Sequence, residues 1–402
     1  MTEPFLEGTT VLDFTQYLAG PACTRLLAEL GANVIKVEAS PSGDPTRDRQ
    51  PMVDGRAGLF VQQNRGKRSL AVDLRHPEGV ALIKDLAAKV DVVVENATPG
   101  VMARKGLGYD HLAAINPSIV YASISGFGQY GPYSTRKSFD FIAQAMSGMM
   151  HMTGEPDGPP YFVGVGLADT NAGVHAFAGI GYALLRRHRT GKGAHIDVAM
   201  TDAMFHMHEF AVQASSLDPD VVPLRQGRHY QPSAPAGTFR CSGGWIVLLC
   251  TDQQVDLLWQ AMGRSDLSDD PRYATNPLRV QHRAEITELL EDWLATFDGV
   301  DQALDALVEA GVPAGKVMSP ADAVNDPHFI ERGTVRTIDD PHLGSFSAPG
   351  FPIKFDGAPI DPPLATASLG EHNHEVLTTL LGWTDAQVAA AESAGVLTSA
   401  ER

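Results

Sequence analysis

An aspartate that follows two glycines, directly before a long apolar segment, is the strongest candidate for a reactive side chain. Asp169 lies in the stretch Gly164-Val-Gly-Leu-Ala-Asp-Thr-Asn171. A carboxylate there can attack an acyl group as a nucleophile, and the glycines leave room for a substrate against the backbone. The alternative is structural, because Asp commonly caps the first free N–H groups of a helix. If both hold, the positive end of the helix keeps the carboxylate ionised.

Positive charge is concentrated in one part of an acidic chain. The 402 residues carry 31 Lys and Arg against 48 Asp and Glu, a net charge of −17, whereas residues 36–105 hold twelve basic and nine acidic residues. Such a segment beside helix N-termini suits a phosphate-bearing ligand, and the alternative is a solvated basic face. The overall acidity argues against binding to nucleic acids or to anionic membranes.

Familiar cofactor and hydrolase motifs are missing. No GxGxxG follows the first predicted strand, and the chain has no GxxxxGK[ST], GxSxG or HExxH pattern, so no motif supports NAD, ATP, a serine hydrolase or a metalloprotease. Cys23, Cys241 and Cys250 lack CxxC spacing, which favours neither a disulfide framework nor a zinc site, and we expect no metal. Without an apolar run of about 18–20 residues or a signal peptide, we expect a cytoplasmic protein.

The elements that would position these residues alternate along the first third of the chain. Residues 10–14 and 32–38 read as strands on either side of a helix over 21–30, with Pro at its start and Gly31 after its end. This βαβ pattern predicts an α/β fold with a doubly wound parallel sheet. It continues in predicted strands at 91–95 and 119–123 and predicted helices at 77–89 and 109–115.

The rest of the chain predicts a second unit. Residues 170–189 form an apolar helix whose small side chains suit close packing against another helix or a subunit. The Pro- and Arg-containing stretch 218–235 reads as a linker. Beyond it, a strand at 245–250, an amphipathic helix around 286–294 and a helix at 301–310 indicate a separate smaller domain, as the length of the chain suggests.

Several short segments resemble the class III CoA-transferase family, whose relatives include formyl-CoA:oxalate CoA-transferase, carnitine CoA-transferase and α-methylacyl-CoA racemase. The resemblance is dense in the first half and extends into the second. It rests on Val11-Leu-Asp-Phe-Thr, Ala19-Gly-Pro-Ala-Cys, Leu30-Gly-Ala-Asn-Val-Ile-Lys-Val-Glu38, Gly43-Asp-Pro-Thr-Arg47, Asn64-Arg-Gly-Lys-Arg-Ser69, Val94-Glu-Asn96, Gly166-Leu-Ala-Asp169, Gly191-Lys-Gly, Asp197-Val-Ala-Met, Gly311-Val-Pro-Ala-Gly315 and Asp326-Pro-His328.

This resemblance implies a domain organisation and a partner. Residues 1–217 and 331–402 would form one Rossmann-like CoA-binding domain, the latter range including a return linker. Residues 218–235 would be a linker, and residues 236–330 a small inserted α+β domain. Two subunits would be threaded through each other as an interlocked homodimer.

The resemblance also implies a reaction. The residue that matches Asp169 would attack an acyl-CoA thioester and then carry CoA as an aspartyl thioester, from which a small carboxylic acid leaves as the new acyl-CoA. Backbone N–H groups near the helix start would stabilise the oxyanions. CoA is thus expected as part of substrate and product.

The positions that match CoA contacts in the family can be named one by one. Ala39 stands where the oxalate enzyme has Arg, and the glycine-rich loop of that enzyme is missing around 226–235, so oxalate is a poor guess for the acceptor. The run 64–68 matches phosphate contacts. The remaining matches are Gln16, Tyr17, Arg47, Val72, Arg75, Asn96, Arg104 and Lys137.

Two other functions stay open. A racemase needs two bases on opposite faces of the reacting carbon, and racemase relatives have His where this chain has Phe139. A catalytically silent CoA-binding protein is the second alternative, and Asp169 argues against it. In the substrate pocket, Asp140 is either a second carboxylate or a helix start, and Arg228 or His229 is a candidate to bind a second substrate carboxylate.

Overall fold

The computed structural model describes residues 4–356 and 364–399. By internal contacts the chain forms two units, a large unit of Met1–Met149, Phe162–Val212 and Pro327–Arg402 and a small unit of Met150–Tyr161 and Gln213–Asp326. This division puts the two ends of the chain in one unit and adds residues 150–161 to the small one. Residues 357–363, inside the predicted return linker, and 400–402 lie outside the described residues. The finer domain boundaries stay a prediction.

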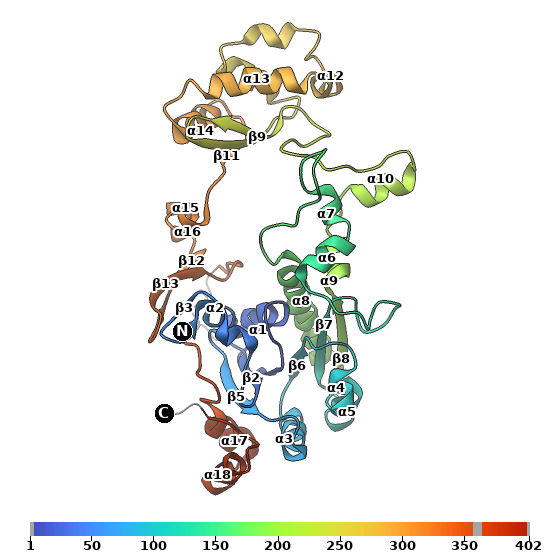
Figure 1. The fold of residues 1–402 in the computed structure, drawn as a ribbon, viewed down its shortest axis with the longest axis vertical. Coiled ribbons are helices and arrows are strands. Elements are labelled where there is room, and N and C mark those ends of the chain that lie inside the picture. Colours follow the sequence, from blue (N-terminus) through green and yellow to red (C-terminus); the bar gives the residue numbers. More distant parts are fainter. Residues whose placement is uncertain (1–3, 357–363, 400–402) are drawn as a thin grey trace. The chain divides into compact units, whose positions relative to one another are not determined.

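A six-stranded sheet with only parallel pairings forms the centre of the large unit (Figure 1). The strand order is β5-β2-β1-β6-β7-β8, so the direction of winding reverses at β1. The predicted α/β fold with a parallel sheet is confirmed. The strands are β1 (Thr10–Asp13), β2 (Asn33–Ala39), β5 (Arg68–Val72), β6 (Val92–Glu95), β7 (Val120–Ser125) and β8 (Ala194–Ala199).

Helices cover both faces of this sheet because its strands are apolar on both sides. Val11 and Val34 belong to one buried cluster, and their neighbours Leu12 and Ile35 belong to another. Successive side chains of a strand point to opposite faces, so the sheet needs a helical layer on each. One face packs against α3 (Pro77–Ala87), α5 (Tyr109–Ile115), α17 (Asn373–Leu381) and α18 (Asp385–Ser393), and the other against α1 (Ala19–Glu29), α6 (Asp140–Met146), α8 (Leu167–Thr190) and α9 (Met200–Phe205).

The C-terminal helices are joined to the first strands by specific bonds as well as by packing. The backbone N–H of Ala71 in β5 donates to Asn373 Oδ1 of α17 at 2.9 Å. Val72 and Leu397 form an isolated antiparallel bridge. The last part of the chain therefore completes the layer that begins with α3.

Shorter elements fill the rest of the large unit. Arg56 donates to Asp340 at 2.8 Å and so links β4 to β12. These elements are the 3₁₀ helix η1 (Pro45–Asp48), β3 (Met52–Val53), β4 (Arg56–Ala57), α2 (Gly58–Asn64), α4 (Val101–Arg104), α16 (Pro327–Glu331), β12 (Val335–Asp340) and β13 (Gly344–Pro349).

The small unit has its own core of antiparallel strands and helices. The strand order is β11-β10-β9, and Trp259 and Leu290 are among its fully buried side chains. Its elements are β9 (Ala236–Cys241), β10 (Gly244–Leu249), α11 (Val255–Ala261), the 3₁₀ helix η2 (Ser265–Asp269), α12 (Asn276–Gln281), α13 (Arg283–Leu294), α14 (Val300–Glu309), β11 (Ala314–Lys316) and α15 (Pro320–Ala323). Helices α7 (Met149–Met152) and α10 (Ala211–Leu217) lie where the chain passes between the units.

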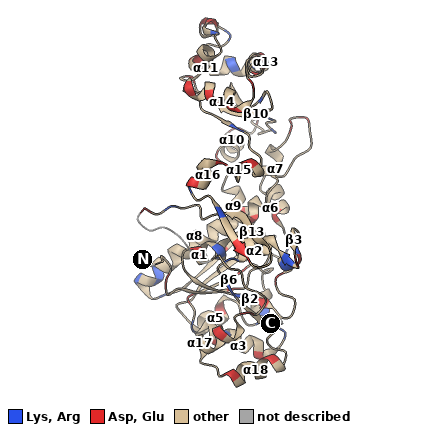
Figure 2. Cartoon of the chain, turned by 90° about the vertical axis from the view of Figure 1, so that its left-hand side faces the viewer, with Lys and Arg blue, Asp and Glu red and all other residues tan. Residues whose placement is uncertain are grey.

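Some of the negative charge lies on outer helices of the large unit. Figure 2 shows acidic residues on α3, α17 and α18, where Glu78, Asp85 and Glu392 are exposed. Within the described ranges, no helix combines the length and the apolar character that a membrane crossing requires.

Candidate active site

A cavity of about 640 Å³ opens in the large unit where the parallel strands end. Its wall includes Gln16 after β1, Ser40 after β2, Asn96 after β6 and Gly126 after β7. The carboxyl ends of parallel strands meet at one edge of a sheet, and a cleft forms there where the winding direction reverses. Asp169, from the first turn of α8, lines the same cavity.

Most of the residues expected at the site line this cavity. They are Gln16, Tyr17, Val72, Arg75, Asn96, Lys137, Phe139 and Asp169. Two further cations that the sequence analysis missed, Lys105 and Arg136, also line it. Lys105 directly follows the expected Arg104, and because α4 has only four residues, no helical periodicity indicated which of the two side chains faces the cavity.

Five expected site residues lie outside the lining of the cavity, and one of them, Asp140, instead bonds to the helix that carries Asp169. Arg47 is paired with Glu38 at 2.7 Å and covers the ring of Phe60. Arg104 is exposed at the end of α4. Arg228 and His229 belong to the small unit, where Arg228 forms an ion pair with Glu291.

The basic run 64–68 is mainly structural. Arg65 is buried against Glu29 with an N–O distance of 2.5 Å, and Lys67 is buried against Asp13 at 3.0 Å. The expectation that Arg65 and Lys67 contact phosphates is therefore wrong, because their charges are neutralised inside the core. Counting charges along the chain cannot reveal this, since each partner lies more than 30 residues away.

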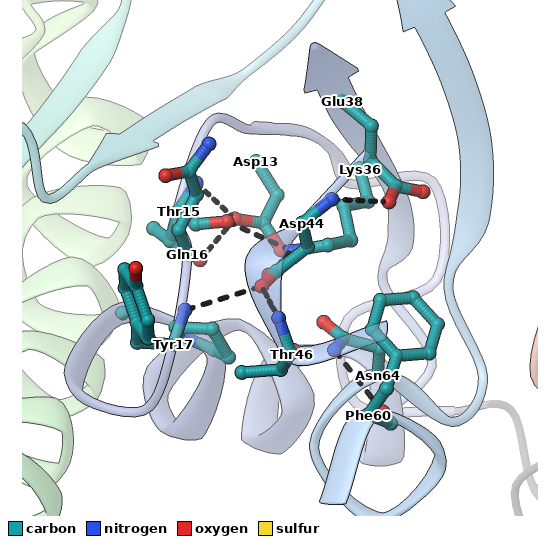
Figure 3. A network of polar contacts seen from close by, with 12 residues as sticks. Asp13, Thr15, Gln16, Tyr17, Lys36, Glu38, Asp44, Thr46, Phe60 and Asn64 are labelled. Carbon is teal, nitrogen blue, oxygen red and sulfur yellow. Dashed lines mark hydrogen bonds and ion pairs between the residues drawn. The ribbon is translucent and has the colours of Figure 1, made fainter. Parts of the chain in front are cut away.

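A buried polar network holds the loop after β1 (Figure 3). Lys36 Nζ donates to the backbone oxygen of Thr15 at 2.7 Å and pairs with Asp44 at 2.9 Å. Asp44 Oδ1 accepts from the backbone N–H of Tyr17 at 3.5 Å and of Thr46 at 2.9 Å. Tyr17 has a φ of 64°, a left-handed conformation that costs a non-glycine residue about 1 kcal/mol or more. The network fixes this strained loop at the edge of the cavity.

Asn96 holds the same loop from the other side. Its Oδ1 accepts from the backbone N–H of Gln16 at 2.8 Å, and its Nδ2 donates to the backbone oxygen of Gln16 at 2.8 Å. These two bonds use both ends of the Asn96 amide. Gln16 and Tyr17 are thus presented to the cavity by a loop that is tied at both flanks.

Asp169 is not the cap of its helix. It is the third residue of α8, the N-cap is Gly166, and that residue provides no side-chain bond. The backbone N–H groups of Ala168 and Asp169 instead donate to Asp140 Oδ1, at 2.7 and 3.1 Å. The capping interpretation is therefore wrong for Asp169, and Asp140 takes that role while it also begins α6. Neither N–H group is left to stabilise an oxyanion.

The carboxyl of Asp169 is harder to ionise than expected. Burial, and then the negative charge of Asp140, raise the pKa of Asp169 to about 7. The expectation that the helix start keeps it ionised is therefore corrected, because Asp140 already occupies the positive end of α8. At neutral pH about half of the Asp169 side chains carry a charge. Such a carboxylate, little stabilised by solvent, is a strong candidate for a nucleophile.

Phe139 lines the cavity beside this carboxyl-bearing turn. Its side chain is 67% exposed, and its ring meets that of Tyr17 edge to face, with 6.4 Å between the ring centroids. A phenyl ring carries no exchangeable proton, so this position provides shape and apolar contact only. Among residues 4–356 and 364–399, no group of three or more His, Cys, Asp or Glu is placed to hold a metal ion.

Comparisons with known proteins agree with one another. The sequence profile of CoA-transferase family III matches residues 6–373. The chain is 35% identical to the succinyl-CoA:D-citramalate CoA-transferase of Chloroflexus aurantiacus over 98% of both chains. It is also 35% identical to the succinyl-CoA:glutarate CoA-transferase of Mus musculus, over 98% of this chain and 90% of that one. A solved CAIB/BAIF family protein from Brucella suis superimposes with a TM-score of 0.84 at 38% identity, covering 94% of this chain and 100% of that chain.

Proposed function

The chain belongs to CoA-transferase family III, so it is a class III CoA-transferase that moves CoA between acyl-CoA and carboxylic acids, and we propose that Asp169 is its nucleophile. The observation that carries this proposal is the position of Asp169 in the cavity at the strand ends. There Asp169 lines the same cavity as Gln16, Tyr17 and Lys137. Hydrogen bonds from Asn96 and Asp44 hold the loop that carries Gln16 and Tyr17 in place.

The proposed reaction has four balanced steps. The Asp169 carboxylate attacks the donor thioester, so a mixed anhydride forms and CoA thiolate leaves. The thiolate attacks the aspartyl carbonyl, which gives an aspartyl-CoA thioester and releases the donor acid as its carboxylate. The acceptor carboxylate then attacks this thioester, so a second anhydride forms and CoA thiolate leaves again. Finally the thiolate attacks the acceptor acyl carbon, and the new acyl-CoA departs from a regenerated Asp169.

We assign the binding of the CoA phosphates to cations around the cavity. Arg75 and Lys137 match CoA contacts of the family, and Lys105 and Arg136 line the same cavity. The cavity is lined by both polar and apolar groups, which suits a ligand with a charged nucleotide end and a neutral pantetheine arm. The names of the two relatives make succinyl-CoA the first donor and a dicarboxylic acid the first acceptor to test.

Mass spectrometry of trapped enzyme tests this function. We expect purified protein incubated with succinyl-CoA, and then with a panel of other acyl-CoA donors, to gain the mass of CoA on the peptide that contains Asp169. An adduct on another peptide would contradict the assignment. Exchange of the α-proton of a branched acyl-CoA with deuterated water, without an adduct, would instead favour the racemase. Phe139 argues against that outcome, because it replaces one of the two bases that racemisation needs.

The rate of adduct formation should depend on pH in a defined direction. The nucleophile is the ionised form of Asp169, and the pKa of this group is raised to about 7. We expect the single-turnover rate to rise about tenfold per pH unit below pH 7 and to level off above it. Rapid-quench measurements between about pH 5 and pH 9 check this, and a rate that stays flat below pH 7 would contradict it.

We also propose that the protein is a homodimer. Helix α8 leaves large apolar side chains in water in the single chain, with Tyr182 74% and Leu185 52% exposed. Large apolar side chains exposed one turn apart on a helix are what a subunit interface would cover. Sedimentation equilibrium should give twice the chain mass of 43.0 kDa, and Tyr182→Asp combined with Leu185→Asp should shift the mass toward the monomer. A wild-type mass of a single chain at micromolar concentration would overturn the proposal.

A further inference from the structure

The first turn of α8 has no unused backbone donors. Leu167 N–H donates to the backbone oxygen of Val165 at 2.8 Å, and Thr170 N–H donates to that of Gly166 at 3.0 Å. The two N–H groups between them donate to the same oxygen, Asp140 Oδ1. One carboxylate from α6 therefore replaces the side-chain cap that Gly166 lacks, and it reaches the backbone of the nucleophile itself.

A second buried side chain anchors Asp140. Gln144, one turn further along α6, donates from Nε2 to Asp140 Oδ2 at 2.6 Å. Its Oε1 accepts from the backbone N–H of Val163 at 2.9 Å. Asp140 is 7% exposed and Gln144 is 1% exposed, so solvent competes little with these bonds. The pair ties the segment 163–169 to α6 at both of its ends.

This arrangement places the negative charge of Asp140 next to Asp169. In the proposed reaction Asp169 is a negatively charged nucleophile that becomes neutral when it is acylated. Asp140 is held within 3.1 Å of the backbone nitrogen of Asp169, and it neutralises the positive end of α8. The carboxylate of Asp169 therefore receives repulsion where an uncapped helix would provide stabilisation. When Asp169 becomes an anhydride or a thioester it is neutral, and the repulsion disappears.

We propose that Asp140 is a positioning residue that activates Asp169. It fixes the first turn of α8 against α6 through Gln144, and its charge favours the acylated form of Asp169 over the free carboxylate. This inference rests on the proposed function, because it requires Asp169 to form the aspartyl-CoA thioester. Asp140 acts on the reaction only through Asp169 and does not itself contact the substrate.

The experiment measures the rate and the final amount of the CoA adduct in three variants of the full-length protein. Measurements at about pH 8.5 keep Asp169 ionised in every variant. Asp140→Asn keeps an oxygen for the two N–H groups but removes the charge, so we expect a rate about fivefold lower and an adduct-to-free ratio about tenfold lower. Asp140→Ala also removes the anchor, and we expect a rate about 100-fold lower.

A paired variant tests whether a restored acceptor and a restored negative charge together recover the rate. In Asp140→Asn the amide nitrogen faces the Nε2 of Gln144, and both are donors. Adding Gln144→Glu provides an acceptor for that nitrogen and for Val163 N–H, and it returns the negative charge one hydrogen bond further from Asp169. We expect this double variant to recover the rate to within about threefold of wild type. Thermal melting of each variant shows that it is folded.

The outcomes distinguish this inference from the function on which it rests. If Asp140→Asn forms the adduct at the wild-type rate and to the wild-type extent, the inference is overturned while the nucleophile stands. If the double variant is folded but no faster than Asp140→Asn, a negative charge and intact hydrogen bonds at this place do not activate Asp169, and the inference is again overturned. If wild-type protein forms no adduct with any donor, the proposed nucleophile fails, and the role of Asp140 fails with it.

Discussion

Replacement of Asp169 by Ala is expected to lower transferase turnover by about 10⁴-fold or more and to abolish the CoA adduct. Asp140 cannot take its part, because it is bound to the backbone of α8 and to Gln144. The carboxyls of Glu38 and Asp73, which also line the cavity, are each paired with an arginine. Binding of acyl-CoA should change by no more than about threefold, since the cations proposed to bind the phosphates are untouched. Turnover is measured as new acyl-CoA, and binding by isothermal titration calorimetry.

The matched control is Asp202→Ala. Asp202 lies in the first turn of α9 and is exposed outside the cavity lining, so its removal should leave turnover within about twofold. An Asp169→Ala protein that keeps more than about a tenth of wild-type turnover would contradict the proposed mechanism. Equal acyl-CoA binding with no turnover in either wild type or variant would indicate a silent CoA-binding protein.

Stability provides an independent check on the same residue. The folded-state pKa of Asp169, about 7, lies above its usual value of 3.8, so the fold loses stability as the pH rises from about 4 to about 7. Asp169→Asn should therefore be more stable than wild type at pH 8, by about 1–2 kcal/mol after allowance for solvent screening, and about equally stable near pH 3. Loss of activity in that variant cannot then be attributed to unfolding.

The second large effect is expected on removal of the Lys36 ammonium group. Lys36→Met leaves Asp44 buried without its ion-pair partner and leaves the backbone oxygen of Thr15 without a donor. Breaking a buried ion pair from one side costs about 3–5 kcal/mol of unfolding free energy. Because the same bonds hold Gln16 and Tyr17 at the cavity, binding of acyl-CoA should weaken as well. Urea unfolding and calorimetric titration measure the two effects.

An exposed ion pair of the large unit is the matched control. Arg68 pairs with Glu375 at 3.2 Å, and both side chains are largely in water. Arg68→Met should cost less than about 1 kcal/mol, because such pairs are screened and lose side-chain entropy when they form. If Lys36→Met were as mild as Arg68→Met, the Lys36 network would not be what holds the loop.

Local sequence patterns were sufficient for the architecture. The alternation of short apolar strands with capped helices in residues 10–38 predicted the βαβ unit, and the sheet built on it is confirmed. A sheet that is apolar on both sides needs helices on both sides, and this follows from strand periodicity alone. The motif residues around Asp169 likewise indicated the family, because a motif is recognised from the types and order of its residues, without knowledge of the fold.

The electrostatics of the site were decided only by the tertiary structure. Asp140 and Asp169 are 29 positions apart, and Lys67 lies 54 positions from Asp13, so no local pattern shows that each pair is in contact. Burial and the nearest charge together determine whether a carboxylate is ionised or a cation is free. Both depend on packing between distant segments. Sequence therefore identified the carboxylate, and the fold determined which groups neutralise the helix end, which cations face the cavity and how reactive Asp169 is.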